Sequence, residues 1–165
     1  LSYANQSARL LGMDLSASHD LGVLEPVGRL GLTAAAGLVQ GVNRGTGDPL
    51  YHQMPLNARL GLQQSRGDWS QSLDGRLVAA KRRVSAVRNE LPTPGYAVLD
   101  WRAGVEWHPV RLDLAIENLF DRRYALPLGG AYVGQGASMS TTSLPWGVTV
   151  PGRGRSFNEI GRAHV

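Results

Sequence analysis

The sequence of 165 residues contains no cysteine, which excludes a disulfide framework and any thiolate metal site. It also has no run approaching the roughly 20 apolar residues that a membrane-spanning helix needs. No P-loop, nucleophile elbow or zinc-spaced histidine pair is present. The Gly-x-Gly sequences at 134–136 and 152–154 lack the strand–turn–helix context of a dinucleotide-binding fold. These absences leave no recognisable catalytic centre, so we expect no enzymatic activity, no cofactor and no metal site.

The charge balance is basic but does not indicate a nucleic-acid-binding protein. Seventeen Lys and Arg against thirteen Asp and Glu give a net charge of +4 and a pI near 10.0. The basic residues are scattered, and the only run is Lys81-Arg82-Arg83. No RNP, helix-turn-helix or zinc-finger signature accompanies it. We therefore expect no nucleic-acid partner.

Apolar and polar residues alternate with a period of two in seven stretches of the chain. In one of them Leu99, Trp101 and Val105 share one face, while Asp100, Arg102 and Glu106 share the other. Such alternation predicts β-strands, because a helical period of 3.6 would mix the charges with the tryptophans. The stretches exceed the five or six residues usual in soluble sheets and suit tilted membrane strands. They lie near 9–18, 27–43, 57–66, 69–82, 97–107, 110–117 and from about 148 onward.

The connections between these stretches alternate between short and long. Tight turns are expected at Gly67-Asp68 and His108-Pro109, whereas the segments 43–56, 84–95 and 125–147 are long and rich in Gly, Pro, Asn and Thr. Bacterial outer-membrane barrels have short periplasmic turns and long extracellular loops. The pattern therefore predicts an all-β fold, an antiparallel up-and-down meander of about seven strands, which is typical of a transmembrane β-barrel.

The polar face holds charges of both signs, which can be assigned in two ways. In a barrel these side chains line a wet lumen, whereas in a soluble β-sandwich they face the surrounding water. Alternation alone does not separate the two. Under the barrel interpretation the lumen-facing residues are Asp100, Arg102, Glu106, Arg111, Asp113 and Glu117. Their carboxylates are interpreted as parts of a salt-bridged wall rather than as catalytic pairs.

The long connections supply the candidate ligand contacts, because long loops on a rigid scaffold tend to carry function. His52 and Met54, with Met139 of the last loop, have the side chains that bind soft metals, but three residues on two loops do not define a site. We expect any ligand to meet the aromatic, His and Met side chains of these loops: Tyr51, His52, Met54, Tyr132 and Trp146.

Three segments carry a family resemblance. NLFDRRY (118–124), PLGGAYVGQG (127–136) and WGVTVPGRGRSF (146–157) strongly resemble the C-terminal end of TonB-dependent outer-membrane receptors. The resemblance implies that residues 1–158 supply barrel wall and extracellular loops to a larger receptor in the bacterial outer membrane. Such receptors import scarce nutrients, such as siderophore-bound iron, cobalamin, copper or a similar chelate. Membrane lipid would surround the barrel, and the TonB complex would act through an N-terminal plug.

Two alternatives remain open from the sequence. One is another outer-membrane barrel, such as a porin or adhesin, and the other is a soluble β-sandwich that binds carbohydrate.

The two ends of the chain depart from what a native sequence would show. The chain begins at Leu1 with no signal peptide, so we expect a cut N-terminus. Residues 159–165, EIGRAHV, match the in-frame translation of a sequencing adapter, so we expect them to be non-native and to stand outside the fold.

Overall fold

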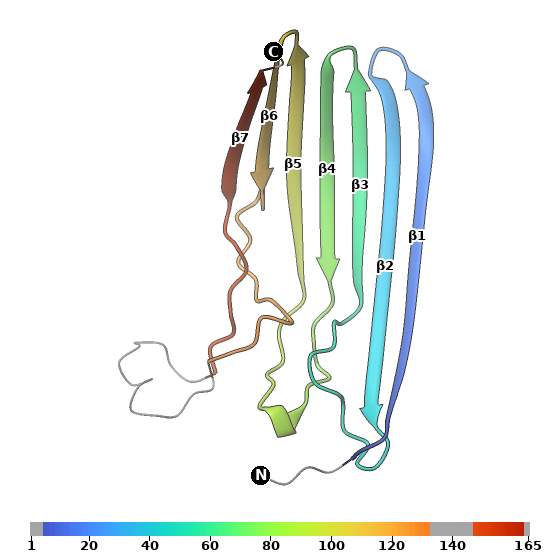
Figure 1. Cartoon of the computed structure of the whole chain (residues 1–165), viewed down its shortest axis with the longest axis vertical. Helices are drawn as coiled ribbons and strands as arrows, with labels where there is room; N and C mark the ends of the chain where they lie inside the picture. The colour runs from blue at the N-terminus through green and yellow to red at the C-terminus, as the bar shows by residue number, and fades with distance from the viewer. Residues whose placement is uncertain (1–4, 133–146, 164–165) are drawn as a thin grey trace, which may run out of the picture.

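The computed structural model describes residues 5–132 and 147–163, which form a single antiparallel sheet of seven strands in chain order (Figure 1). One 3₁₀ turn, η1 (Ala86–Arg88), lies in the connection between the fourth and fifth strands. Within the described ranges, no helix has the length and apolar character needed to cross a membrane. The order of the seven strands in one antiparallel sheet confirms the predicted all-β meander. The strands are β1 (Ala8–Leu24), β2 (Gly28–Asn43), β3 (Asn57–Arg66), β4 (Trp69–Val78), β5 (Tyr96–Trp107), β6 (Val110–Glu117) and β7 (Ser156–Ala163).

The pairing register places the two alternating residue sets on opposite faces of the sheet. Trp101 of β5 lies opposite Leu73 of β4 and Ile116 of β6. Its neighbour Arg102 lies opposite Ser72 and Ala115. Because directly opposed residues share a face, the strands place most of their apolar side chains on one surface and most of their charged ones on the other. We name these surfaces the apolar face and the polar wall.

The sheet is one layer thick, so the apolar face is bare. The buried hydrophobic residues among those described are only Val78, Val98 and Ala125. Met13 on the apolar face is 71% exposed, and Trp107 is 81% exposed. A contiguous apolar surface of this extent marks contact with a membrane or another protein.

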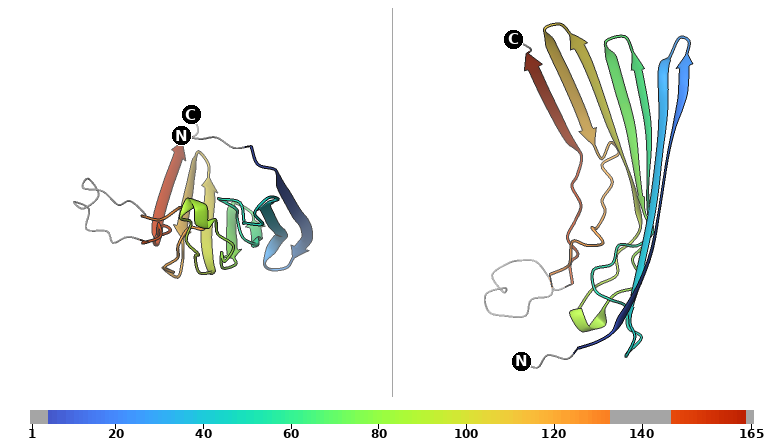
Figure 2. Two further views of the ribbon diagram at one scale, coloured as in Figure 1. Left: turned by 90° about the horizontal axis from the view of Figure 1, so that it is seen from below. Right: turned by 45° about the vertical axis from the view of Figure 1, so that its right-hand side comes forward.

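Short and long connections lie at opposite ends of the strands (Figure 1). The β1–β2, β3–β4 and β5–β6 hairpins are tight, and the glycines Gly28 and Gly67 adopt φ of +99° and +56° in the first two. A side chain at Gly28 would also clash with the carbonyl oxygen of Ser65. The three long connections gather at the other end, and the sheet is curved across its strands (Figure 2). The predicted alternation of connections is confirmed.

Three strand boundaries differ from the prediction. β1 extends to Leu24, whereas β4 ends at Val78, after which Lys81 pairs with Thr93 in an isolated bridge. β7 begins at Ser156 rather than near 148. In the preceding segment Thr149 and Pro151 make only isolated bridges to the same long loop. Pro151 has no N–H to give to a ladder, which ends regular pairing there.

The expectation that residues 159–165 stand outside the fold is wrong for 159–163, since β7 pairs with β6 as far as Ala163. Backbone N–H and C=O groups form such a ladder with little regard for side chains. The side chains nevertheless depart from the pattern. Glu159 lies opposite Leu114 on the apolar face, and Ile160 lies opposite Asp113 on the polar wall. Residues 164–165 lie outside the described residues.

Candidate functional site

The polar wall is a network of ion pairs between neighbouring strands. Arg76 binds Asp100 and Arg102 binds Asp74, each with a nitrogen–oxygen distance of 3.3 Å. Asp100 is only 8% exposed, and its second oxygen accepts the backbone N–H of Asn118 at 2.8 Å. The carboxylates are thus engaged by cations and N–H donors, which indicates a structural role rather than a catalytic one.

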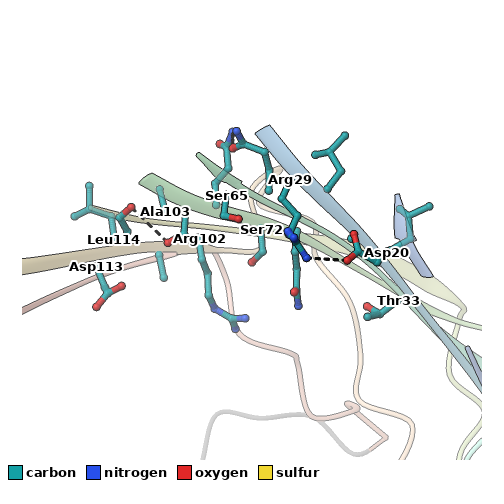
Figure 3. Close-up of a pocket in the computed structure, with 18 of the residues that line it drawn as sticks. Asp20, Arg29, Thr33, Ser65, Ser72, Arg102, Ala103, Asp113 and Leu114 are labelled. Atoms are coloured by element: carbon teal, nitrogen blue, oxygen red, sulfur yellow. Dashed lines mark hydrogen bonds and ion pairs between the residues drawn. The ribbon is translucent and has the colours of Figure 1, made fainter. Parts of the chain in front are cut away.

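The remaining predicted wall residues follow the same arrangement. Arg111 donates to Asp113 at 2.9 Å and lies 3.7 Å from Glu106, while Glu117 accepts from Arg153 at 3.2 Å. The structure therefore brings all six predicted residues onto one surface. A pocket of about 800 Å³ lies along this surface and includes the Arg29–Asp20 ion pair (Figure 3). Such a wall can bind water, polar solutes or polar protein segments.

The NLFDRRY segment ties the end of β6 to the start of β7. Asn118 adopts a left-handed conformation with φ of 51°, and its side-chain amide donates to the carbonyls of Arg122 and Arg153 at 2.9 and 3.1 Å. Its side-chain oxygen accepts the N–H of Arg122. Asp121, also left-handed, accepts the N–H of Arg155 at 3.0 Å. Short polar side chains of this kind tolerate the left-handed region, which is the local signal for such a corner.

At the long-loop end, a buried ion pair joins three connections. Lys81, 2% exposed, donates to Glu90 at 2.5 Å and to the carbonyl of Pro127 at 3.0 Å. Glu90 also accepts the N–H groups of Ser85 and His52 at 2.8 and 3.1 Å. We name this cluster the loop junction, comprising Tyr51, His52, Lys81, 85–93 and 126–131.

The environment of Glu90 keeps it ionised. Burial opposes its charge, but the hydrogen bonds from Lys81, Ser85 and His52 outweigh burial and lower the pKa of the Glu90 carboxyl below its ordinary value. Sequence reasoning missed this pair because Lys81 stands in a basic run and Glu90 in a long loop. Lys81 and Glu90 are nine residues apart, and this spacing predicts no contact because the two meet only when the loop folds back.

The predicted ligand contacts are partly brought together. The rings of Tyr51 and His52 stack with centroids 4.9 Å apart, and His52 Nε2 lies 2.7 Å from the carbonyl oxygen of Leu128. That contact joins the 43–56 loop to the last one. Tyr132 lies beyond it, paired through its backbone with Val148. Met54 is half-buried on the first loop, and Trp146 and Met139 lie outside the described residues. Within the described ranges, no three His, Cys, Asp or Glu residues gather as metal ligands.

Comparison with known proteins gives two kinds of similarity, although no family model matches the chain. Two sequences named heme/hemopexin utilization protein C, both from Haemophilus influenzae, are 30% identical over 125 residues. The match covers 72% of this chain and 16% of each relative.

A solved structure named copper transporter OprC superposes with a TM-score of 0.80 at 27% sequence identity. The alignment covers 97% of this chain and 24% of that one. The chain thus spans about a sixth of the length of the curated relatives and about a quarter of the solved structure.

Proposed function

Because the chain is a β-barrel segment of a TonB-dependent receptor, we propose that its receptor imports a scarce nutrient across the bacterial outer membrane. The chain contributes wall and loops to this process and carries out no chemical step. The observation that carries the proposal is the superposition of nearly the whole chain on a transporter of this kind. The bare apolar face supports it, since membrane lipid would cover this surface.

The two surfaces have separate roles in this proposal. The polar wall faces the barrel interior, where Asp100, Arg102, Glu106, Arg111, Asp113 and Glu117 line a hydrated path. The long loops face the outside and meet the ligand first, through Tyr51, His52, Met54, Tyr132 and Trp146. The cargo is a compact chelate: siderophore-bound iron, cobalamin, copper or, as the names of the relatives add, heme.

The alternatives from the sequence now separate. The soluble β-sandwich is wrong, because the described strands form one sheet with no second layer packed on the apolar face. A porin or adhesin would share the barrel but would work without energy from the inner membrane. Dependence on TonB therefore distinguishes the proposed function from these two.

Uptake by the full-length receptor tests the proposal. A host lacking its own receptors is supplied with this receptor and offered hemin, cobalamin, a copper chelate or a ferric siderophore as limiting nutrient. Growth on one of these nutrients, lost when the gene for TonB is deleted, is the expected result. Growth that survives the deletion would indicate a porin, and no growth on any chelate would contradict nutrient import.

A further inference from the structure

The loop junction encloses a small pocket that the contacts described above leave unexplained. The pocket has a volume of about 90 Å³ and is lined from all three long connections, by Tyr51 and His52, by Arg88 and Thr93, and by residues near Pro127. It lies apart from the large pocket on the polar wall, with which it shares no lining residue. A space of this size holds a few waters or one compact polar group.

Thr93, which lines this pocket, has a buried side-chain hydroxyl. The residue is 4% exposed, and its backbone N–H and C=O both pair with Lys81, at 3.1 and 2.9 Å. Its Oγ1 is the one buried side-chain polar atom, among the described residues, that has no hydrogen-bond partner. Leaving such a group unpaired costs about 1–3 kcal/mol. The hydroxyl therefore points to an occupant that would bond to it.

The charges around the pocket favour an anionic occupant. The Glu90 carboxylate is neutralised by Lys81 and accepts two backbone N–H groups besides. Arg88 also lines the pocket, and its guanidinium has no ion-pair partner in residues 5–132 and 147–163. Two cations against one carboxylate leave a charge of +1 at the pocket, which attracts a negative group.

The aromatic pair favours a planar occupant. Since a carbonyl oxygen only accepts, His52 Nε2 donates its hydrogen to the carbonyl of Leu128, which fixes the orientation of the ring. The His52 ring is held nearly parallel to that of Tyr51, with an interplanar angle of 11°. A flat, rigid wall of this kind suits stacking against a planar group.

We infer that the loop junction holds a subsite for a planar carboxylate. The Thr93 hydroxyl and the Arg88 guanidinium bind the carboxylate, and the Tyr51–His52 pair lies against the remainder of the ligand. This inference goes beyond the proposed function, because it concerns the group that the loops recognise and holds whether or not the receptor imports that compound.

Benzoate binding to the full-length receptor in detergent micelles tests the subsite, with benzamide as the uncharged isostere. In a titration followed by saturation-transfer NMR, benzoate should bind at least about tenfold more tightly than benzamide. Thr93→Val removes one hydrogen bond to a charged group and should weaken benzoate binding about tenfold, whereas Thr93→Ser should retain it. Arg88→Gln should remove the preference for benzoate over benzamide.

Three results would overturn the inference: equal affinity for benzoate and benzamide, unchanged benzoate binding in Thr93→Val, or no saturable binding at all, which would mean that the pocket holds water only. Thr93→Val deletes a hydroxyl without a partner and should leave the fold intact, as heat-modifiable gel mobility will report. Arg88 is exposed, so Arg88→Gln tests the subsite even where the valine variant does not fold. Nutrient uptake in the same variants separates failure of the subsite from failure of the proposed transport.

Discussion

At the scale of single residues, a place on the polar wall does not by itself make a position tolerant of substitution. Alternation would treat Asp100 and Gln63 alike, since both occupy the polar parity. Asp100 is buried and binds both Arg76 and the N–H of Asn118. Gln63 is exposed, and its side chain makes no hydrogen bond among the described residues. Gln63 is therefore the position at which the polar wall should accept a new charge.

Arginine substitution at neighbouring positions of β3 tests which face meets lipid. Leu62→Arg should destabilise the full-length barrel by about 2–4 kcal/mol if the residue lies near the bilayer midplane, because a lipid-facing guanidinium has no water around it. Gln63→Arg is the matched control and should cost less than about 1 kcal/mol, since its side chain enters a wet space. Urea unfolding in lipid vesicles, followed by gel mobility, measures both. Equal costs, or the reverse order, would contradict the assignment of the two faces.

Asn118 should stabilise the fold through both its backbone conformation and its side-chain amide. Asn118→Gly keeps the left-handed conformation but loses the bonds to Arg122 and Arg153, for an expected loss of about 1–3 kcal/mol. Asn118→Ala should cost about 1 kcal/mol more, because alanine resists that conformation. Unfolding of the two variants in urea measures the difference. If alanine proved no worse than glycine, the left-handed corner would not matter for stability.

At the scale of elements, β7 shows that pairing and side-chain alternation are separable. Its ladder to β6 is regular, yet Glu159 occupies the apolar face and Ile160 the polar wall. A carboxylate on a lipid face is unfavourable unless it is neutralised or reaches the interface. The inversion begins at Glu159, the first residue of EIGRAHV.

We propose that the gene continues differently after Asn158. Resequencing of the genomic locus should replace EIGRAHV with residues that restore apolar side chains at the positions of Glu159 and Gly161. The expectation follows from the registers of Glu159 and Gly161 opposite Leu114 and Leu112. Genomic DNA that encodes EIGRAHV would contradict it.

The loop junction should loosen in acid. The pKa of Glu90 is lowered on folding, so its stabilising effect is complete above its ordinary value near 4.5 and is lost as the pH falls through the lower folded value. A nitroxide attached at Val87→Cys, an exposed site on η1, should become more mobile as the pH falls below 4.5. Glu90→Gln should raise this mobility already at pH 7. If the label were equally mobile with and without the Glu90→Gln substitution at pH 7, Glu90 would not hold the loop.

At the scale of the whole molecule, local features could be predicted from the sequence, whereas contacts between distant segments could not. Period-two alternation and turn residues act over a few positions, so the order of strands and the faces of Trp101 and Arg102 could be predicted. The contacts of Lys81 with Glu90 and Pro127 form only after two long loops fold back. No local sequence pattern therefore predicts this cluster. The start of β7 differs from the prediction for a related reason, because apolar residues around 148–150 resemble a strand while pairing with a loop.

The chain without the rest of its barrel should not behave as a soluble protein. β1 and β7 each pair along one edge only in the described sheet, and the apolar face is uncovered. Open edges and bare apolar surface promote aggregation. Expressed alone, the chain should form inclusion bodies and dissolve only in detergent or denaturant. Sedimentation as a monomer in plain buffer would contradict this expectation.

The loop junction also affects how the receptor could change its ligand over evolutionary time. Because one carboxylate fixes backbone from the 43–56 and 84–95 loops and its lysine holds a third, the frame does not depend on the exposed side chains that it displays. Substitutions at Val87, Arg88 and Tyr51 therefore leave the contacts of Glu90 and Lys81 with the three loops in place. New binding preferences would arise by exchanging such residues on a constant frame, whereas a change at Lys81 or Glu90 would alter all three loops at once.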